Sequence, residues 1–547
     1  RNFVLGGAGL KDIEKKRFRE ISEELATLSL KFDENVLEET NSFELHLTDK
    51  DDMAGLPENI IEMASIEASA RGKQGWIFTL HFPSYIPFMQ YSEKRELRRK
   101  MLIAYSSRGF RGNASDNRDI IIKIVNLRLE IAKILRFNNF AAMTLGDRMA
   151  DTQSKVEEFL QDLYDASKPA ALRDFKNVST FASECGLNDS LERWDWAYYS
   201  EKLKKKQFDI NDEILKPYFR LENTQTAVFE LASSLYGIRF VKCSSIPVYH
   251  QEVKTYEVYD SDNSFLAVLY VDYHPRTGKN GGAWMTSFRD QRNSEESDIR
   301  PLISIVANFT RPSETRPSLL SFNELTTFLH EFGHALHGMM SKCTYESLSG
   351  TNVARDFVEL PSQFMENFAY EKKWLDTWAS HFLTGEKIPD EIIDRIKEAS
   401  TYNEGYACFR QLGFAFLDMA WHTAEEPVET NISDFETGLS GKTELFPAID
   451  GTCISASFGH IFGGGYAAGY YGYKWAEVLD ADAFSYFTEK GIFNKETAAS
   501  FRNNILEKGG TEKPHDLYVK FRGQEPSLEA FLVRSGLVNL SPTPLSF

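Results

Sequence analysis

The chain has 547 residues, of which 42% are hydrophobic, 13% aromatic and 26% charged, and this composition excludes a disordered or fibrous protein. Its 62 Lys and Arg against 80 Asp and Glu leave a net charge of −18, which argues against nucleic acid as a partner. The longest apolar runs, such as Pro301 to Phe309, fall far short of the ~20 residues of a membrane span, so no membrane association is expected. Five cysteines without a C-x-x-C pair indicate neither a disulfide framework nor a thiolate metal site.

Helical patterns dominate the chain up to about Tyr236. Lys11 to Glu39 carries apolar residues at helical spacing among many charges and contains no proline, which predicts a long amphipathic helix. Gly75 to Phe82 (GWIFTLHF) is a short strand-like run. Further helices are predicted at Glu93–Arg108, Asn117–Arg136, Lys155–Ser167 and Asn223–Leu235.

A small sheet is predicted inside this helical protein. Val253–Tyr259 and Phe265–Tyr273 are rich in β-branched and aromatic residues and flank the turn signal Asp260–Asn263, which predicts a hairpin. Leu302–Phe309 is a third strand candidate, and helices resume at Asn323.

The segment from Ser321 to His337 (SFNELTTFLHEFGHALH) predicts a helix that binds a metal ion. Ser321 and Glu324 form a plausible capping box ahead of a helix with a regular apolar face. His330 and His334 are one turn apart, so both imidazoles can reach one Zn²⁺, while Glu331 can hold a water bound to that ion. Two histidines buried for packing alone are the less favoured interpretation in this context.

A catalytic zinc site needs a third protein ligand and an open position for water. The extended metzincin pattern is excluded, because positions 337 and 340 are His and Met. Asp356 to Tyr370 is interpreted as a second helix with a polar stripe that could offer a carboxylate to the metal, although spacing alone favours a solvated face. The spacing does not choose among Glu346, Glu359 and Glu366. His337 would close the water position as a fourth ligand, so a supporting or packing role is preferred.

Phe328 to Gly338 (FLHEFGHALHG) and Ser349 to Gln363 (SGTNVARDFVELPSQ) are very similar to the signature of the thimet oligopeptidase and peptidyl-dipeptidase family of zinc metallopeptidases. This resemblance implies that Glu359 is the third zinc ligand. It spans essentially the whole chain, because further segments resemble the family at Gly75–Tyr91, Gly278–Trp284 and Phe521–Pro526.

Two segments, Pro317–Ser321 and His460–Trp475, look more like the bacterial dipeptidyl carboxypeptidase branch than the endo-oligopeptidase branch. Family members usually carry an additional helical region before the part that resembles Arg1 to Thr40. We therefore expect such a region to be missing from this chain.

The Gly- and Tyr-rich segment His460–Tyr473 has two interpretations on its own, a loop that orders over substrate or a plain turn with core aromatics. The resemblance implies that His460, Tyr466 and Tyr473 contact the substrate or the transition state, with Tyr470 as a weaker candidate. Tyr473, helped by Tyr466, would stabilise the oxyanion.

Substrate main chain is predicted to add to the edge of the strand Phe265–Tyr273 and to the turn Gly281–Gly282, with an internal hairpin as the alternative.

The predicted chemistry is hydrolysis assisted by zinc. Glu331 would take a proton from water and pass it to the leaving amine. The predicted metal ligands are His330, His334 and Glu359, which hold one Zn²⁺ per chain.

The resulting predictions cover fold, domains and function. The fold is expected to be mainly α, with two helical lobes flanking a deep substrate channel and a small antiparallel sheet beside the zinc-site helix. Residues 1–92 are interpreted as the remainder of an N-terminal helical region, and residues 93–547 as a catalytic region that forms both walls of the cleft.

The predicted activity is release of C-terminal dipeptides from short peptides. The alternatives are an endo-acting oligopeptidase and a zinc-containing peptide-binding protein without turnover. The sequence leaves the location open between cytoplasm and periplasm and does not indicate an oligomeric state.

Overall fold

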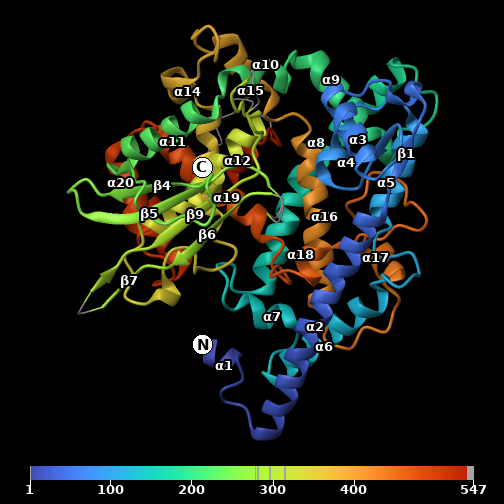
Figure 1. Ribbon diagram of the computed structural model, residues 1–547. Coiled ribbons are helices and arrows are strands. Elements are labelled where there is room, and N and C mark those ends of the chain that lie inside the picture. Colours follow the sequence, from blue (N-terminus) through green and yellow to red (C-terminus); the bar gives the residue numbers. More distant parts are fainter. Residues whose placement is uncertain are drawn as a thin grey trace, which may run out of the picture. The chain divides into compact units, whose positions relative to one another are not determined.

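The computed structural model describes residues 2–276, 279, 282–294, 297–312, 316–440 and 442–538, and the chain forms two compact units (Figure 1). The first unit comprises Arg1–Gln207 and Asn403–Tyr471, and the second comprises Phe208–Tyr402 and Gly472–Phe547. Both are mainly helical, as predicted. The predicted division between residues 92 and 93 stays a prediction.

The first unit is built from helices and one two-stranded sheet. Its elements are α1 (Asn2–Leu5), α2 (Asp12–Ser42), β1 (Leu45–Leu47), η1 (Lys50–Met53), α3 (Glu58–Ala70), β2 (Trp76–Phe78), α4 (Phe82–Tyr91), α5 (Arg95–Ser106), α6 (Arg118–Ile134), α7 (Phe140–Leu145), α8 (Gln153–Glu184), α9 (Arg193–Phe208), α16 (Glu404–His422), α17 (Ile432–Ser440), η5 (Ser455–Ser457) and α18 (Gly459–Phe462). The long amphipathic helix predicted over Lys11–Glu39 is confirmed as α2. None of the described helices combines the length and the apolar character needed to cross a membrane.

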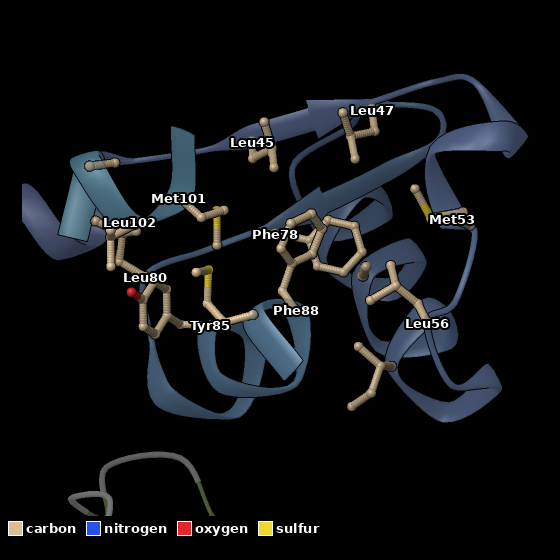
Figure 2. Close-up of a cluster of buried hydrophobic side chains, with 14 residues drawn as sticks. Leu45, Leu47, Met53, Leu56, Phe78, Leu80, Tyr85, Phe88, Met101 and Leu102 are labelled. Atoms are coloured by element: carbon tan, nitrogen blue, oxygen red, sulfur yellow. The ribbon is translucent and has the colours of Figure 1, made fainter. Parts of the chain in front are cut away.

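Two apolar clusters show how described residues of this unit pack. Ile21 of α2 packs on Leu127 and Ile131 of α6, so the long N-terminal helix lies along α6. Figure 2 shows the second cluster, in which the antiparallel pair β1–β2 packs against α3, α4 and α5 through residues including Leu45, Leu47, Met53, Leu56, Phe78, Leu80, Tyr85, Phe88, Met101 and Leu102. Phe78 and Phe88 are fully buried there, and truncating either to alanine would cost about 3–5 kcal/mol.

The second unit combines helices with the larger sheet. Its helices are α10 (Asp212–Leu215), η2 (Lys216–Tyr218), α11 (Leu221–Tyr236), α12 (Phe322–Met339), η3 (Glu346–Leu348), α13 (Leu360–Glu366), η4 (Asn367–Tyr370), α14 (Lys372–Trp378), α15 (Asp390–Ala399), α19 (Gly472–Lys490), α20 (Lys495–Phe501), η6 (Arg502–Leu506), α21 (Pro514–Arg522) and α22 (Leu528–Arg534). Its strands are β3 (Arg239–Lys242), β4 (Lys254–Tyr259), β5 (Phe265–Asp272), β6 (Trp284–Arg289), β7 (Arg292–Asn293), β8 (Asp298–Ile299) and β9 (Leu302–Val306).

The sheet has five strands in the order β3-β4-β5-β9-β6. The predicted hairpin is confirmed, since β4 and β5 pair antiparallel with Tyr256 opposite Leu269. The sheet is mixed, however, because β5 and β9 run parallel with Val268 opposite Leu302, whereas β3–β4, β4–β5 and β6–β9 are antiparallel. The long connection between β5 and β9 allows that parallel pairing and leaves room for β6.

The sheet positions the metal-binding helix. Helix α12 contacts β5, β6 and β9 (Figure 1). Phe328 and Phe332, one turn apart on this helix, are fully buried and supply its apolar face. Phe328 packs edge-on against Tyr273, with ring centroids 5.4 Å apart, and Phe332 lies 5.9 Å from Phe240. This packing leaves the opposite side of α12 for the polar residues of the site.

Candidate active site

Helix α12 begins where the sequence predicts. The Ser321 hydroxyl accepts a hydrogen bond from the Glu324 amide at 3.1 Å, and the Glu324 carboxylate accepts one from the Ser321 amide at 2.8 Å. This capping box satisfies two backbone donors of the first turn and fixes where the helix starts. His330 and His334 then lie on one face, with ring centroids 4.9 Å apart.

Glu359, the residue directly before α13, lies beside these histidines. Its Oε2 lies 3.3 Å from Nε2 of His330 and 3.2 Å from Nε2 of His334. The Ser362 hydroxyl donates to the same oxygen at 3.0 Å and orients the carboxylate. Within the described part of the chain, His330, His334 and Glu359 form the only group of three or more His, Cys, Asp or Glu side chains able to hold a metal ion, with all ligand atoms within 4.8 Å of one another.

The helix predicted over Asp356–Tyr370 starts later in the structure. Helix α13 begins at Leu360, so Asp356 and Glu359 precede it and do not belong to a helical stripe. Their side chains are also buried, with 1% of Asp356 and 8% of Glu359 exposed, so a solvated face is the wrong interpretation. Pro361 at the first turn explains the later start, because its fixed backbone suits a helix N-terminus and not a helix interior.

A glycine in α12 allows the close approach of this segment. A Cβ at position 333 would lie 2.3 Å from the Pro361 carbonyl oxygen and 2.6 Å from Cα of Ser362. No residue with a side chain fits there without displacing backbone. Gly333 therefore lets the start of α13 touch α12, which brings Glu359 within reach of both histidines.

The structure distinguishes the three candidates for the third ligand, Glu346, Glu359 and Glu366, by their positions relative to the histidines. Glu366 lies on the other side of His330, where its Oε1 is 2.6 Å from Nδ1. That contact leaves Nε2 of His330 free to face Glu359 and a metal ion. Glu346 is half exposed, and its nearest described ion-pair partner is Arg292 at 3.9 Å. The sequence named Glu366 only as a possible metal ligand and did not indicate this contact with His330.

Hydrogen bonds within the site shift the pKa values of His330 and Glu359. Burial alone lowers the pKa of His330, but its hydrogen bonds to Glu359 and Glu366 outweigh that effect and raise it to about 10. Burial alone raises the pKa of Glu359, but hydrogen bonds from His330 and His334 hold it well below its usual range. A protonated imidazole between two carboxylates marks a place that favours a cation, and a metal ion can take that role once the proton leaves.

The donor set fits Zn²⁺. Two ligand atoms that each lie about 2.1 Å from a tetrahedral zinc are about 3.4 Å apart, close to the 3.2 and 3.3 Å found between Glu359 Oε2 and the two imidazole nitrogens. Nitrogen and carboxylate oxygen are the ligands that zinc uses in catalytic sites. Three protein ligands also leave a fourth position for water or substrate.

Glu331 is placed beside this site and lacks a partner on one oxygen. Its side chain is 6% exposed, and its Oε2 is buried without a hydrogen bond. Burial raises the pKa of Glu331, while the backbone amide of Met285 on β6 hydrogen-bonds to its carboxylate. A buried carboxylate oxygen without a protein donor is suited to a water molecule or a substrate group.

An open cavity of about 250 Å³ adjoins these groups. It is lined by Ala283, Asn323, Thr326, Thr327, His330, Glu331 and Glu366. The first turns of α12 and the segment before β6 therefore enclose a space next to the proposed base.

His337 does not belong to the ligand set. Its side chain is fully buried, and neither ring nitrogen has a hydrogen bond. Burial lowers the pKa of His337 to about 3, which keeps the ring neutral. A packing role accounts for this placement.

The other predicted site residues are divided between the two units. His460, Tyr466 and Tyr470 belong to the first unit and Tyr473 to the second, where it lies in the first turn of α19. The Tyr470 hydroxyl donates to Gln411 Oε1 at 2.9 Å, and its ring packs between Phe414 and Phe458. Tyr470 thus has a structural place, whereas His460 is exposed and Tyr466 half-buried.

The edge-strand prediction needs a correction. Strand β5, which contains the predicted Phe265–Tyr273 edge, is central in the sheet, because β4 covers one side and β9 the other. The strands at the two edges are β3 and β6. Gly281 lies outside the described residues. Gly282 is two residues before β6, and its carbonyl accepts a hydrogen bond from Asn308 at 2.7 Å.

Comparisons with known proteins show which family the chain belongs to. Oligopeptidase A of Escherichia coli strain K12 is 38% identical over 545 residues, which cover 98% of this chain and 80% of the relative. Dipeptidyl carboxypeptidase of the same strain is 36% identical over 541 residues, covering 98% and 79%. An X-ray structure of a protein assigned as oligoendopeptidase F has a TM-score of 0.58 at 15% identity and covers 96% of this chain and 75% of that one, which shows a shared fold. The model of peptidase family M3 matches residues 88–537. The chain therefore belongs to peptidase family M3 and is a zinc metallopeptidase.

Proposed function

We propose that this metallopeptidase cuts short peptides at internal bonds, with His330, His334 and Glu359 as its zinc ligands. The contact of one Glu359 oxygen with both imidazoles, 3.3 and 3.2 Å away, is the observation that carries this assignment. When bound, Zn²⁺ acidifies a water molecule and polarises the scissile carbonyl.

Glu331 acts as the proton carrier. Its unpartnered Oε2 accepts a proton from the attacking water and delivers it to the nitrogen of the leaving amine. The raised pKa of Glu331, caused by burial, brings the carboxyl closer to neutral pH, where accepting and donating a proton are both favourable. In this proposal, the Tyr473 hydroxyl donates to the carbonyl oxygen as negative charge develops there.

The substrate main chain adds to β6. This strand pairs with β9 on one side, and no described strand pairs with its other side. Its Met285 amide hydrogen-bonds to Glu331, so a peptide that extends β6 would pass directly by the proposed base. Backbone pairing of this kind recognises peptides with broad side-chain preference.

The names of the relatives support internal cleavage over release of C-terminal dipeptides. The oligopeptidase A from Escherichia coli is 38% identical and the dipeptidyl carboxypeptidase 36%, which is the reverse of the order that the resemblance in Pro317–Ser321 and His460–Trp475 predicts. Dipeptide release is the second candidate function, because the two identities are close. A peptide-binding role without turnover is disfavoured by the intact Glu331.

Product analysis tests the proposal. A decapeptide with a free carboxylate and its C-terminal amide are digested by the native protein, by protein treated with a chelator, and by Glu331→Gln, and the products are identified by mass spectrometry. Internal cuts in both peptides that disappear on chelation and in Glu331→Gln are expected. Loss of two residues at a time from the free acid alone would replace the proposal with a peptidyl-dipeptidase. No cleavage by the zinc-loaded native protein would refute it.

A further inference from the structure

We infer that Asn367, Asp480 and Arg534 form a polar cluster that positions Glu366 against His330 and thereby raises the affinity of the site for its metal ion. The inference rests on the proposed function, because it takes His330 as a zinc ligand. All of these residues belong to the second unit. Asn367 begins η4, Asp480 lies on α19 and Arg534 is the last residue of α22.

Helix α13 carries a carboxylate at each end, and both contact His330. Glu359 directly precedes the helix and Glu366 is its last residue. Oε2 of Glu359 lies 3.3 Å from Nε2 of His330, and Oε1 of Glu366 lies 2.6 Å from Nδ1 of the same ring. A shift of the far end of α13 would therefore change the orientation of the imidazole that is to meet the metal ion.

The side chain of Glu366 is not fixed by close packing. It is 36% exposed and lines the open cavity of about 250 Å³ beside the metal site. A long side chain at the edge of a cavity keeps rotamer freedom unless the backbone that carries it is held in place. The contact with His330 therefore depends on what fixes the end of α13.

Asn367 fixes this end of the helix. Its Nδ2 donates to the carbonyl oxygens of Gln363 and Phe364, each 3.1 Å away. Both carbonyls belong to the last turn of α13, where the helix itself supplies no partner. The same nitrogen donates to Oδ1 of Asp480 at 2.6 Å. Because Asn367 directly follows Glu366, this side chain ties the end of α13 to α19.

Asp480 and Arg534 hold Asn367 in turn. Asp480 is 2% exposed, and its Oδ2 accepts a hydrogen bond from Nη1 of Arg534. The same Nη1 donates to Oδ1 of Asn367 at 2.8 Å. Both polar atoms of the Asn367 amide and both oxygens of Asp480 thus have a partner within the cluster. Removing one member leaves a polar atom of another without its partner, which is costly inside a protein.

The charges of the cluster also act on Glu366. Burial raises the pKa of Asp480 to about 6, and the negative charge of Glu366 adds to that rise, whereas Arg534 and Asn367 oppose it. Burial alone lowers the pKa of Arg534, but Asp480 outweighs burial and raises it, with a contribution from Glu366. Arg534 therefore provides positive charge to both carboxylates.

Next to the cluster, the contact between α13 and α19 is apolar. The ring of Phe364 lies 5.7 Å from that of Phe484 and 4.8 Å from that of Phe487. Asp480 lies one turn before Phe484 and two turns before Phe487, on the same face of α19. Apolar residues stabilise such a contact at least as well as a buried ion pair does. The place of the polar cluster, directly behind Glu366, points to control of geometry.

The test compares Asp480→Asn with Asp482→Asn. Asp482 is a matched control, because it is also buried on α19 but pairs with α21, where Arg522 lies 3.2 Å away and the Tyr518 hydroxyl 2.7 Å away. In Asp480→Asn the new NH₂ group would face a donor of Asn367 or of Arg534, so one hydrogen bond is lost. Zinc affinity is measured by competition with a chelator, and stability by urea unfolding of the zinc-free chain.

Both substitutions are also made in Glu366→Gln, which gives a double-mutant cycle. We expect Asp480→Asn to weaken zinc binding about tenfold when Glu366 is present and within about twofold when it is replaced. Asp482→Asn should leave zinc affinity within about twofold of its parent in both backgrounds. Unchanged affinity in Asp480→Asn, an equal loss in both backgrounds, or the same loss in Asp482→Asn would each overturn the positioning role.

Arg534→Lys is a milder variant if Asp480→Asn does not fold. It keeps the charge but loses the planar fork that reaches Asn367 and Asp480 together, so zinc binding should weaken about threefold, and only while Glu366 is present. Unchanged affinity would again overturn the inference. A native chain that binds no zinc would refute the ligand set and the positioning role together. A native chain that binds zinc but cleaves neither decapeptide would refute the proposed activity, while the cycle still decides the positioning role.

Discussion

Gly333→Ala tests whether the contact between α12 and α13 sets the metal site. The added methyl would lie 2.3 Å from the Pro361 carbonyl oxygen, 2.6 Å from Cα of Ser362 and 2.8 Å from the Pro361 carbonyl carbon. A carbon–oxygen contact needs about 3.3 Å, so the two backbones must separate by about 1 Å. All three atoms belong to backbone, which cannot rotate out of the way.

The sign of the stability change is informative. Alanine is favoured over glycine in a helix by about 1 kcal/mol, whereas overpacking costs about 1–3 kcal/mol. We therefore expect Gly333→Ala to lose up to about 2 kcal/mol of unfolding free energy in spite of its better helix propensity.

The same substitution should weaken zinc binding. Glu359 lies two residues before Pro361 and would move away from His330 and His334 by about 1 Å, the separation of the two backbones. Because ligand distances must hold within about 0.2 Å, zinc affinity should fall at least tenfold.

The assay is competition for zinc with a chelator, combined with urea unfolding and kcat/KM for a quenched fluorescent peptide. Gly338→Ala is the control on the same helix, since the nearest atoms that its methyl would meet belong to side chains: Cδ1 and Cγ1 of Ile303 at 2.8 and 3.3 Å and Cε of Met285 at 3.9 Å. We expect near-native zinc affinity for that variant. Native zinc affinity and kcat/KM in Gly333→Ala would refute the proposed role of the close approach.

The remaining predictions concern the residues around the metal. Glu366→Gln should weaken zinc binding by about 10- to 100-fold, because Glu366 fixes the orientation of His330, and native affinity by isothermal titration would contradict this role. In the zinc-free protein, burial alone lowers the pKa of His330, but Glu359 and Glu366 raise it from 6.5 to about 10. A raised pKa gives stability that is complete below the unfolded value and is lost as the pH rises through the folded one. The melting temperature of the zinc-free protein should therefore fall between pH 6.5 and 10 more steeply than that of Glu366→Gln, and equal slopes would count against the ion pair. Tyr473→Phe should lower kcat about a hundredfold, equal to about 3 kcal/mol, with little change in zinc content, and an unchanged kcat would remove Tyr473 from the mechanism.

Local features of the site could be predicted from the sequence. The spacing of His330 and His334, the Ser321–Glu324 cap and the neighbouring Glu331 follow from helix geometry, which depends on residues a turn apart. The hairpin of β4 and β5 likewise follows from alternation around a turn signal. The shared face of the two histidines, the Ser321–Glu324 cap and the hairpin are confirmed, because the interacting residues are close in sequence. The role of Glu331 stays a prediction.

Three features required the tertiary structure. Spacing could not distinguish Glu359, which contacts both His330 and His334, from Glu366, which contacts the other ring nitrogen of His330. Nor could it show that β5 is central and β6 is at the edge, because the order of strands depends on where β9 returns. The contact of Asn367 with Asp480, 113 positions later, has no local signal at all.

The sequence by itself determined that this chain carries a helix with the H-E-x-x-H pattern of zinc metallopeptidases, since the residues of that pattern lie within about one helical turn of each other. Only the tertiary structure decided which carboxylate completes the ligand set, which strand is open to a peptide and what anchors the end of α13 that carries Glu366. These features depend on close contacts between backbones of different segments. At Gly333, for example, a Cβ atom would lie less than 3 Å from backbone atoms of Pro361 and Ser362. Such approaches follow from the packing of the whole unit, because no short stretch of sequence contains both partners.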